Sequence, residues 1–246
     1  KRNSEEVKLI WVSKFHSAEA VENAIALGAT DFGENRVQEA ESKFSVKRDG
    51  IRCHIIGPVQ KNKLKKAALV ADCIHSISSE EALEKLEKVC VENEKVLEIL
   101  FQVNASEEET KSGLDVNEAE AFLSSLEFKR FPHLRFRGLM TIGKNTGIAE
   151  DSRSCFSFLR NLQQKFLKRG GIFSEFTELS MGMTLAWINQ SLNSTELTHQ
   201  FLGGKEEKFF SQANHIAELR ELRADTLREM QKLYTYDTYN NDSYFD

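Results

Sequence analysis

The stretch Leu9-Ile10-Trp11-Val12-Ser13-Lys14 decides the fold, because it is an apolar run of strand length that ends abruptly on a lysine. Val, Ile and Trp favour a packed, pleated surface, and a continuous apolar run fits a strand covered on both faces, as in a parallel sheet. The Ala- and Glu-rich segment 17–27 then predicts a helix with Ser17 as its N-cap. Lys14 is therefore expected at the carboxyl end of a parallel strand, where α/β folds carry their chemistry.

Two interpretations of Lys14 follow from this position. An amine held against an apolar wall loses its proton more readily than one in water, and a neutral amine can form a Schiff base with a carbonyl group. The simpler interpretation is that Lys14 ends the strand in solvent. Taken alone, the stretch favours the simpler interpretation. The motifs in the rest of the chain shift the balance toward a lysine that forms a Schiff base.

An apolar strand followed by a helix recurs along the chain, which predicts a parallel sheet with right-handed crossovers. The expected strands are 9–14, 29–32, 52–57, 71–77, 96–103, 134–139 and 176–179, and the expected helices include 17–27, 80–93, 116–126 and 151–168. Eight such units close into a (β/α)8 TIM barrel, and about 250 residues is a typical length for one. The rival is an open doubly wound sheet, but no G-x-G-x-x-G follows the first strand. The eighth strand is expected near 197–202, where polar residues dilute the pattern.

Composition narrows the class of protein. The 246 residues carry a net charge of −5, which argues against a protein that binds nucleic acid through its phosphates. No apolar run approaches the length of a membrane span, and no signal-peptide pattern opens the chain. The four cysteines (Cys53, Cys73, Cys90 and Cys155) are scattered, which predicts free thiols in a reducing compartment such as the cytoplasm. Because the chain begins at Lys1 without a methionine, we expect that an upstream segment has been removed.

Polar residues follow several of the expected strands. Asn35 comes after the second strand, where it is either the cap of a helix that runs to about Phe44 or a ligand beside Lys14; the cap is favoured when the residue is viewed alone. Gln60, Asn62 and Lys63 follow the third strand, either as a solvated helix start or as donors to an anion. His75, inside the fourth strand, is interpreted as a hydrogen-bonded core residue.

Seven motifs occur in the order and spacing of one protein family. They are Val12-Ser13-Lys14, Phe32-Gly33-Glu34-Asn35-Arg36-Val37-Gln38-Glu39, His54-Ile55-Ile56-Gly57-Pro58-Val59-Gln60-Lys61-Asn62-Lys63, Gln102-Val103-Asn104, Lys111-Ser112-Gly113-Leu114, Gly138-Leu139-Met140 and Ser180-Met181-Gly182-Met183-Thr184. From about residue 7 to 184 the chain resembles the pyridoxal phosphate homeostasis proteins. These are single-domain barrels similar to the N-terminal domain of alanine racemase. The ordered set carries this resemblance, since one tripeptide alone would mean little.

The resemblance implies a cofactor and a set of residues that bind it. Lys14 would hold pyridoxal 5′-phosphate as a Schiff base, and Asn35 would lie against the cofactor ring. His54 and Met140 would line the pocket. The phosphate would be held after the seventh strand and beyond it, by Ser180, the backbone around Gly182, Thr184, Ser194 and Thr195. No metal is implied.

The chain departs from the family pattern after Met183. The family usually continues with Ser, any residue and Asp, whereas here Thr184 keeps a hydroxyl and Ala186 replaces the acid. Glu196-Leu197-Thr198-His199 stands where the family has a strand that bears an arginine. A lost charge-assisted phosphate contact costs about 1.5–3 kcal/mol, which predicts about tenfold to a hundredfold weaker binding of the cofactor than in a typical member.

The sequence predicts two segments, and it leaves one leading hypothesis and two alternatives for the function. Residues 1–204 would form the barrel, and residues 205–246 a divergent charged helix and a flexible tail rich in Tyr, Asn and Asp. The leading hypothesis is a monomeric carrier without catalytic turnover that binds the cofactor and passes it to apo-enzymes. The alternatives are an amino-acid racemase, for which the chain lacks room for a second domain, and a degenerate barrel that no longer binds the cofactor.

Overall fold

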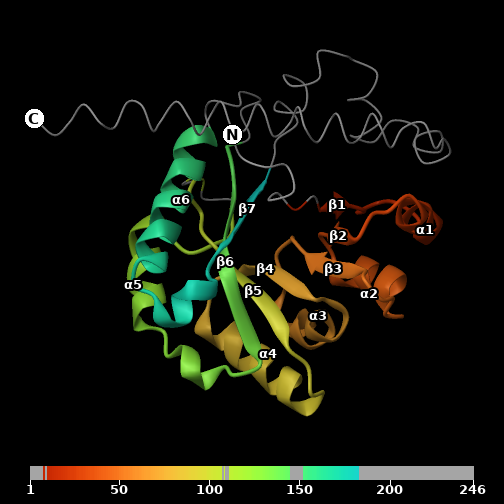
Figure 1. Ribbon diagram of the computed structural model, residues 1–246, viewed down its shortest axis with the longest axis horizontal. Helices are drawn as coiled ribbons and strands as arrows, with labels where there is room; N and C mark the ends of the chain where they lie inside the picture. The colour runs from red at the N-terminus through yellow and green to blue at the C-terminus, as the bar shows by residue number, and fades with distance from the viewer. Residues whose placement is uncertain (1–7, 9, 107, 109–110, 145–151, 183–246) are drawn as a thin grey trace, which may run out of the picture. The chain divides into compact units, whose positions relative to one another are not determined.

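The computed structural model describes residues 8, 10–106, 108, 111–144 and 152–182. The described residues from 10 to 182 belong to one compact unit. Its centre is a seven-stranded sheet in which each strand pairs in parallel with the next one along the chain, in the order β1 to β7 (Figure 1). This arrangement confirms the predicted α/β class with a parallel sheet and crossover helices.

The strands and helices follow the order expected from the sequence. The strands are β1 Trp11–Val12, β2 Asp31–Glu34, β3 Arg52–Ile55, β4 Cys73–Ile77, β5 Leu97–Gln102, β6 Leu134–Ile142 and β7 Glu178–Gly182. The α-helices are α1 Ala18–Ala26, α2 Val37–Phe44, α3 Leu64–Val70, α4 Glu80–Glu92, α5 Val116–Ser125 and α6 Arg153–Leu167, and the 3-10 helices are η2 Lys61–Lys63, η3 Phe128–Arg130 and η5 Gly171–Glu175. The expected eighth strand and the boundary at residue 204 lie outside the described residues.

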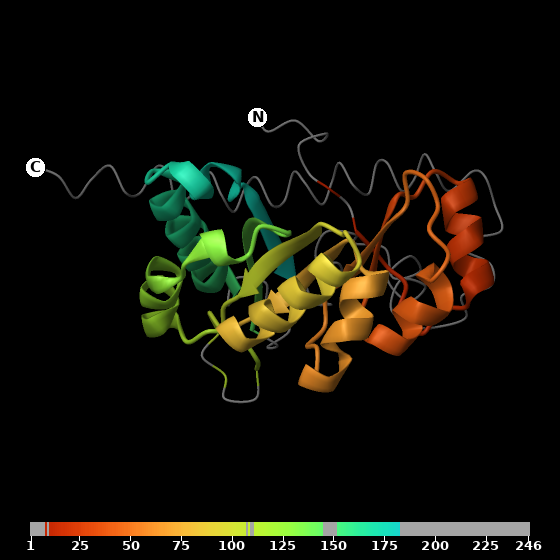
Figure 2. The same cartoon turned by 90° about the horizontal axis from the view of Figure 1, so that it is seen from below.

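The helices cover one face of the sheet. α1 to α4 lie side by side in chain order (Figure 2), and contacts join α1 to α2, α2 to α3 and α3 to α4. The face that a helix turns toward the sheet is apolar, as helical spacing of apolar residues predicts. In α6 the predicted residues Phe156, Leu159, Leu162 and Phe166 are all buried. The other face of the curled sheet is left to form the interior of a barrel.

A cluster of aromatic rings packs the sheet against its last helices. Phe101 on β5 stacks on Phe136 on β6 with the ring centroids 5.6 Å apart, and Phe128 meets Phe136 edge-on at 4.8 Å. Phe176, which is fully buried, lies 6.4 Å from Phe101 and 6.2 Å from Phe166 of α6. Edge-to-face pairs at these separations add to the stabilisation from burial alone. The cluster therefore packs β5 and β6 against α6 and the segment that leads into β7.

Several local predictions are tested by the structure. Ser17 and Ser79 cap α1 and α4, because their hydroxyls accept bonds from the backbone N–H of Ala20 and Ala82. The interpretation of Asn35 as a helix cap is wrong, since Arg36 occupies the N-cap position of α2. The reason is that β2 extends to Glu34, two residues beyond the expected end, and moves the turn along the chain. All four cysteines are free and buried, as predicted. Among the described residues no helix is both long and apolar enough to cross a membrane.

Gly138 is a position where the fold requires glycine. The pairing of β5 with β6 shifts register just before it, and its φ is 154°. A Cβ atom at this position would lie 1.9 Å from the carbonyl oxygen of Glu178 on β7. We expect Gly138→Ala to lower the free energy of unfolding by at least about 1–3 kcal/mol, because β6 and β7 must move apart. Urea unfolding measures this loss. Gly50→Ala is the control, because Gly50 also has a positive φ but has open space around an added Cβ, so this variant has backbone strain without a clash. Equal losses in the two variants would contradict the account.

Candidate functional site

Lys14 and Asn35 lie on the turns after two neighbouring strands, β1 and β2. β1 and β2 are parallel neighbours, with Val12 paired to Gly33, and the backbone N–H of Ser13 donates to the Gly33 carbonyl at 3.0 Å. Lys14 and Asn35 follow directly on these two paired ends, and both side chains are half-buried. Carboxyl ends of parallel strands are where α/β barrels place their functional groups. The structure therefore places Lys14 after the carboxyl end of a parallel strand, as predicted, and Asn35 after the end of the neighbouring strand.

A buried ion pair holds the turn that carries Lys14. The Lys43 ammonium on α2 donates to the Glu34 carboxylate at 2.8 Å and to the Ser13 carbonyl at 2.7 Å. The Ser13 hydroxyl donates to the same Glu34 oxygen at 2.7 Å. Glu34 is fully buried and Lys43 is 7% exposed. Because both charges are desolvated, the pair is sensitive to the loss of either partner. The residue before Lys14 is thus fixed from both its side chain and its carbonyl.

The residue after Lys14 is fixed as well. Phe15 has a φ of 67°, in the left-handed region that a residue with a side chain seldom occupies. Its backbone N–H donates to a carboxylate oxygen of Glu39 at 2.9 Å, and the Arg36 guanidinium lies 6.0 Å from its ring centroid. Strained backbone of this kind costs about 1–3 kcal/mol and persists only where surrounding contacts impose it. The hydrogen bond from Phe15 lowers the pKa of Glu39, with a smaller contribution from Lys43.

This lowered pKa makes the Lys14 turn sensitive to acid. A carboxyl group whose pKa is depressed by folding stabilises the protein above its ordinary pKa of 4.5, and the stabilisation is lost as the pH falls below that value. We expect Glu39→Gln to lower the free energy of unfolding by about 1 kcal/mol at neutral pH, because a charge-assisted hydrogen bond is lost. The difference from the wild type should shrink as the pH falls through 4.5 toward acid. Urea unfolding at several pH values measures it, and a difference that is independent of pH would refute the assignment.

The turn after β3 packs directly on Asn35. A Cβ atom at Gly57 would lie 2.4 Å from the carbonyl oxygen of Asn35, so only glycine allows this approach. The Ser76 hydroxyl on β4 donates to the Gly57 carbonyl at 2.7 Å and holds the turn from the other side. The backbone of Asn35 is therefore confined between its own strand end and the next, which restricts the positions that its amide group can take.

A chain of hydrogen bonds links His54 to Ser180 across the concave side of the sheet. His54 Nε2 lies 3.0 Å from Asp31 Oδ1, His54 Nδ1 lies 3.0 Å from His75 Nε2, and His75 Nδ1 lies 2.9 Å from Ser180 Oγ. β4 and β7 are not neighbours in the sheet, so the last of these bonds crosses its concave side. The interpretation of His75 as a hydrogen-bonded core residue is confirmed. The side chains of His54 and Ser180 are connected through His75, which the sequence analysis did not assign to the site.

The remaining predicted residues divide into two groups. Met140 on β6 is 4% exposed and packs with Cys73 and Leu100, and Gly182 ends β7 opposite Ile142. Thr184, Ser194 and Thr195 lie outside the described residues, as do Ala186 and the segment that replaces the family's arginine.

The groups present fit a cofactor that carries an aldehyde and a phosphate. Lys14 offers an amine and Asn35 an amide, on turns that buried contacts hold in place. Ser180 and Gly182 offer a hydroxyl group and backbone N–H at the end of β7, the region where barrels bind phosphate. This donor set suits a small anionic aldehyde.

Comparison with known proteins gives the class first. Residues 1–197 match the family model described as the N-terminal domain of alanine racemase. The chain is also 38% identical over 188 residues to the pyridoxal phosphate homeostasis protein of Vibrio alginolyticus, covering 74% of this chain and 78% of that protein. The protein of that name from Caenorhabditis elegans is 32% identical over 213 residues, covering 82% and 87%. The chain belongs to the pyridoxal phosphate homeostasis protein family.

Solved structures agree with this assignment. PipY of Synechococcus elongatus without PLP superposes with a TM-score of 0.63 at 28% identity, over 72% of this chain and 90% of that one. PipY with PLP bound superposes with a TM-score of 0.59 at 32% identity, over 72% and 82%. Alanine racemase from Clostridium difficile is 15% identical with a TM-score of 0.57, over 72% and 46%, which shows the shared fold alone. The predicted alanine-racemase-like barrel fold is thereby confirmed.

Proposed function

We propose that this chain binds pyridoxal 5′-phosphate through Lys14 and takes part in its homeostasis. The observation that carries the proposal is the position of Lys14, half-buried on a turn that Glu34, Lys43 and Glu39 hold rigidly at the carboxyl end of β1. Relatives named pyridoxal phosphate homeostasis protein and the PLP-bound structure of PipY support the choice of cofactor.

Each described part of the site has a task in this proposal. When bound, the cofactor supplies an aldehyde that reacts with a neutral amine, and Lys14 carries the amine that would bond to it. Asn35, whose backbone is confined by Gly57, follows the neighbouring strand β2 and would orient the ring. Ser180 and the backbone N–H of Gly182 would contribute to the phosphate site. His54 and Met140 would line the pocket, and Thr184, Ser194 and Thr195 would complete the phosphate contacts.

The absence of catalytic turnover is part of the proposal. Relatives carry the name of homeostasis proteins, which supports binding and transfer of the cofactor to apo-enzymes over a reaction on a substrate. We infer a monomer in a reducing compartment such as the cytoplasm, in keeping with four free thiols. Turnover of L- or D-alanine well above that of the free cofactor would refute the carrier and favour a racemase.

A titration of the purified protein with the cofactor tests the proposal. Binding through an amine should shift the visible absorbance of the cofactor and saturate at one cofactor per chain. Since Glu196-Leu197-Thr198-His199 replaces the arginine-bearing strand, we expect saturation at about tenfold to a hundredfold higher concentration than for a relative that keeps the arginine. A titration that stays flat to millimolar cofactor would instead support a barrel that has lost cofactor binding.

A further inference from the structure

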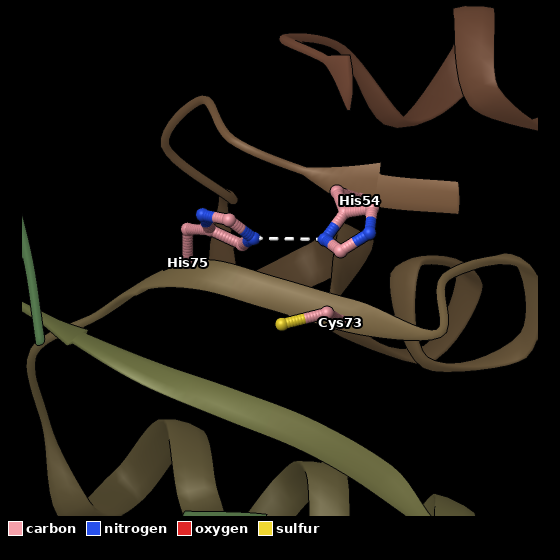
Figure 3. A group of neighbouring side chains, drawn as sticks. All are labelled: His54, Cys73 and His75. Carbon is pink, nitrogen blue, oxygen red and sulfur yellow. Dashed lines mark hydrogen bonds between the residues drawn. The ribbon is translucent and has the colours of Figure 1, made fainter. Parts of the chain in front are cut away.

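Three side chains of metal-binding types converge on the concave side of the sheet. His54 comes from β3, and Cys73 and His75 come from β4, where a spacing of two residues puts them on the same face. One ligand atom from each of the three lies within 4.8 Å of the others, and the side chains are 2%, 2% and 3% exposed. In Figure 3 one nitrogen of each ring points at the other ring, and the sulfur of Cys73 lies below the space between these two nitrogens. We call these three residues the His-Cys-His cluster.

Both histidines have their outer nitrogen held by a polar partner. His54 Nε2 bonds to the Asp31 carboxylate at 3.0 Å, and His75 Nδ1 bonds to the Ser180 hydroxyl at 2.9 Å. A histidine that ligates a metal almost always has its second nitrogen bonded to a carboxylate, a carbonyl or a similar group, which fixes the ring and raises the basicity of the ligand. The inner nitrogens, His54 Nδ1 and His75 Nε2, are the pair that face each other at 3.0 Å.

The positions of the protons in the hydrogen bonds from Asp31 to Ser180 show which hydrogen bond a metal ion would replace. The Asp31 carboxylate can only accept, so it takes the hydrogen bond from His54 Nε2, and in the tautomer protonated at that nitrogen alone His54 Nδ1 carries a lone pair. With this tautomer, His75 donates its Nε2 proton to His54, and the Ser180 hydroxyl donates to His75 Nδ1. If the His75 proton moves to Nδ1, with the Ser180 oxygen accepting, both inner nitrogens present lone pairs to the same point. The rings need not turn for this change.

We propose that His54, Cys73 and His75 form a binding site for a divalent metal ion of the zinc class. Imidazole and thiolate are the ligands that select zinc among biological divalent ions. Two Zn–N bonds of about 2.0–2.1 Å at a tetrahedral angle place the nitrogens about 3.3 Å apart, so the present separation has to open only slightly. The Cys73 thiol loses its proton to solvent as the Zn–S bond forms, and the His75 proton stays on that ring. Three protein ligands leave the fourth position for water.

The metal site shares His54 and the Ser180 hydroxyl with the proposed cofactor pocket, but the ion does not need the cofactor in order to bind. Lys14 contributes nothing to it, and the proposal holds whether or not the chain binds pyridoxal phosphate. Its tests therefore use the cofactor-free protein and the metal alone. A bound ion would also replace the hydrogen bond between the rings of His54 and His75, because both inner nitrogens would then bond to the metal. The predicted metal binding is therefore specific to this cluster.

Cobalt(II) is the spectroscopic probe. Added to the wild-type protein under reducing conditions, it should give the visible bands of tetrahedral cobalt and a near-ultraviolet band from thiolate to cobalt, saturating at one ion per chain. Cys73→Ser keeps the size of the side chain and should lose the thiolate band. Cys90→Ala is the matched control, because Cys90 is a buried thiol on α4 whose pKa burial raises to about 11. That variant should keep both bands.

Zinc gives a second measurement, whose expected result differs from that for a cluster in which the three residues serve only in packing. Zinc should displace cobalt, release one proton per ion and raise the Tm of the wild type but not of Cys73→Ser. Asp31→Asn should weaken zinc binding by about tenfold to a hundredfold, because the outer partner of His54 loses its charge. A wild-type protein that gives no tetrahedral cobalt bands would overturn the proposal. So would a thiolate band that persists in Cys73→Ser.

Discussion

Lys14→Ala is expected to abolish the visible absorbance change on titration with pyridoxal phosphate and all covalent retention of the cofactor after borohydride. The reason is chemical, since alanine has no amine that can bond to an aldehyde. The half-buried position of Lys14, between Ser13 and the strained Phe15, makes it the amine that the fold holds in place. The effect should be complete rather than partial, which makes it the largest that we expect on binding.

A matched lysine variant shows whether this loss is specific. Lys65 lies exposed on α3, so Lys65→Ala removes one amine of the same type from a helix surface. It should bind and retain the cofactor as the wild type does, and both variants should keep the wild-type Tm within a few degrees. Retention that falls equally in Lys14→Ala and Lys65→Ala would mean that borohydride fixes the cofactor on surface amines without a preferred site.

Lys43→Met is expected to lower the free energy of unfolding by about 3–5 kcal/mol, because it leaves the Glu34 carboxylate buried without its counter-charge. Glu34 is fully buried, and Lys43 supplies bonds to both Glu34 and the Ser13 carbonyl. The same change should also weaken cofactor binding, since the turn before Lys14 loses one of its anchors. Urea unfolding followed by circular dichroism measures the first effect and absorbance titration the second.

Two controls separate the buried pair from lysine removal in general. Lys85 pairs with Glu81 on the exposed face of α4, and Lys85→Met should change stability by less than about 1 kcal/mol. In the double variant Glu34→Leu with Lys43→Met no buried charge remains, so it should be more stable than Lys43→Met alone. A Lys43→Met protein as stable as Lys85→Met would show that the buried pair does not hold this turn.

Structural features that depend on a few consecutive residues were predicted well. The alternation of apolar strands with helices gave the parallel sheet, and hydroxyl residues before helices gave the caps Ser17 and Ser79. The end of an apolar strand gave the position of Lys14. Each of these depends on a few consecutive residues and on the periods of helices and strands. The misplaced cap at Asn35 shows the limit of local signals, because the length of β2 depends on its pairing with β3.

The residues that support the site were missed for a different reason. Glu34 and Asp31 lie within a strand whose four residues are all buried, which is unusual for carboxylates. Their partners come from elsewhere in the fold: Glu34 meets Lys43 on α2, and Asp31 meets His54 on β3. The bond between His75 and Ser180 joins residues 105 positions apart. Such contacts exist only once the sheet has curled, so no local pattern predicts them.

The most direct test of the central claim is to reduce the cofactor-loaded wild-type protein with borohydride and to identify the labelled peptide by mass. The proposed function predicts one pyridoxyl phosphate group per chain, attached at Lys14. A label on a different lysine, or no label from a protein that retains its fold, would contradict the claim that this amine binds the cofactor.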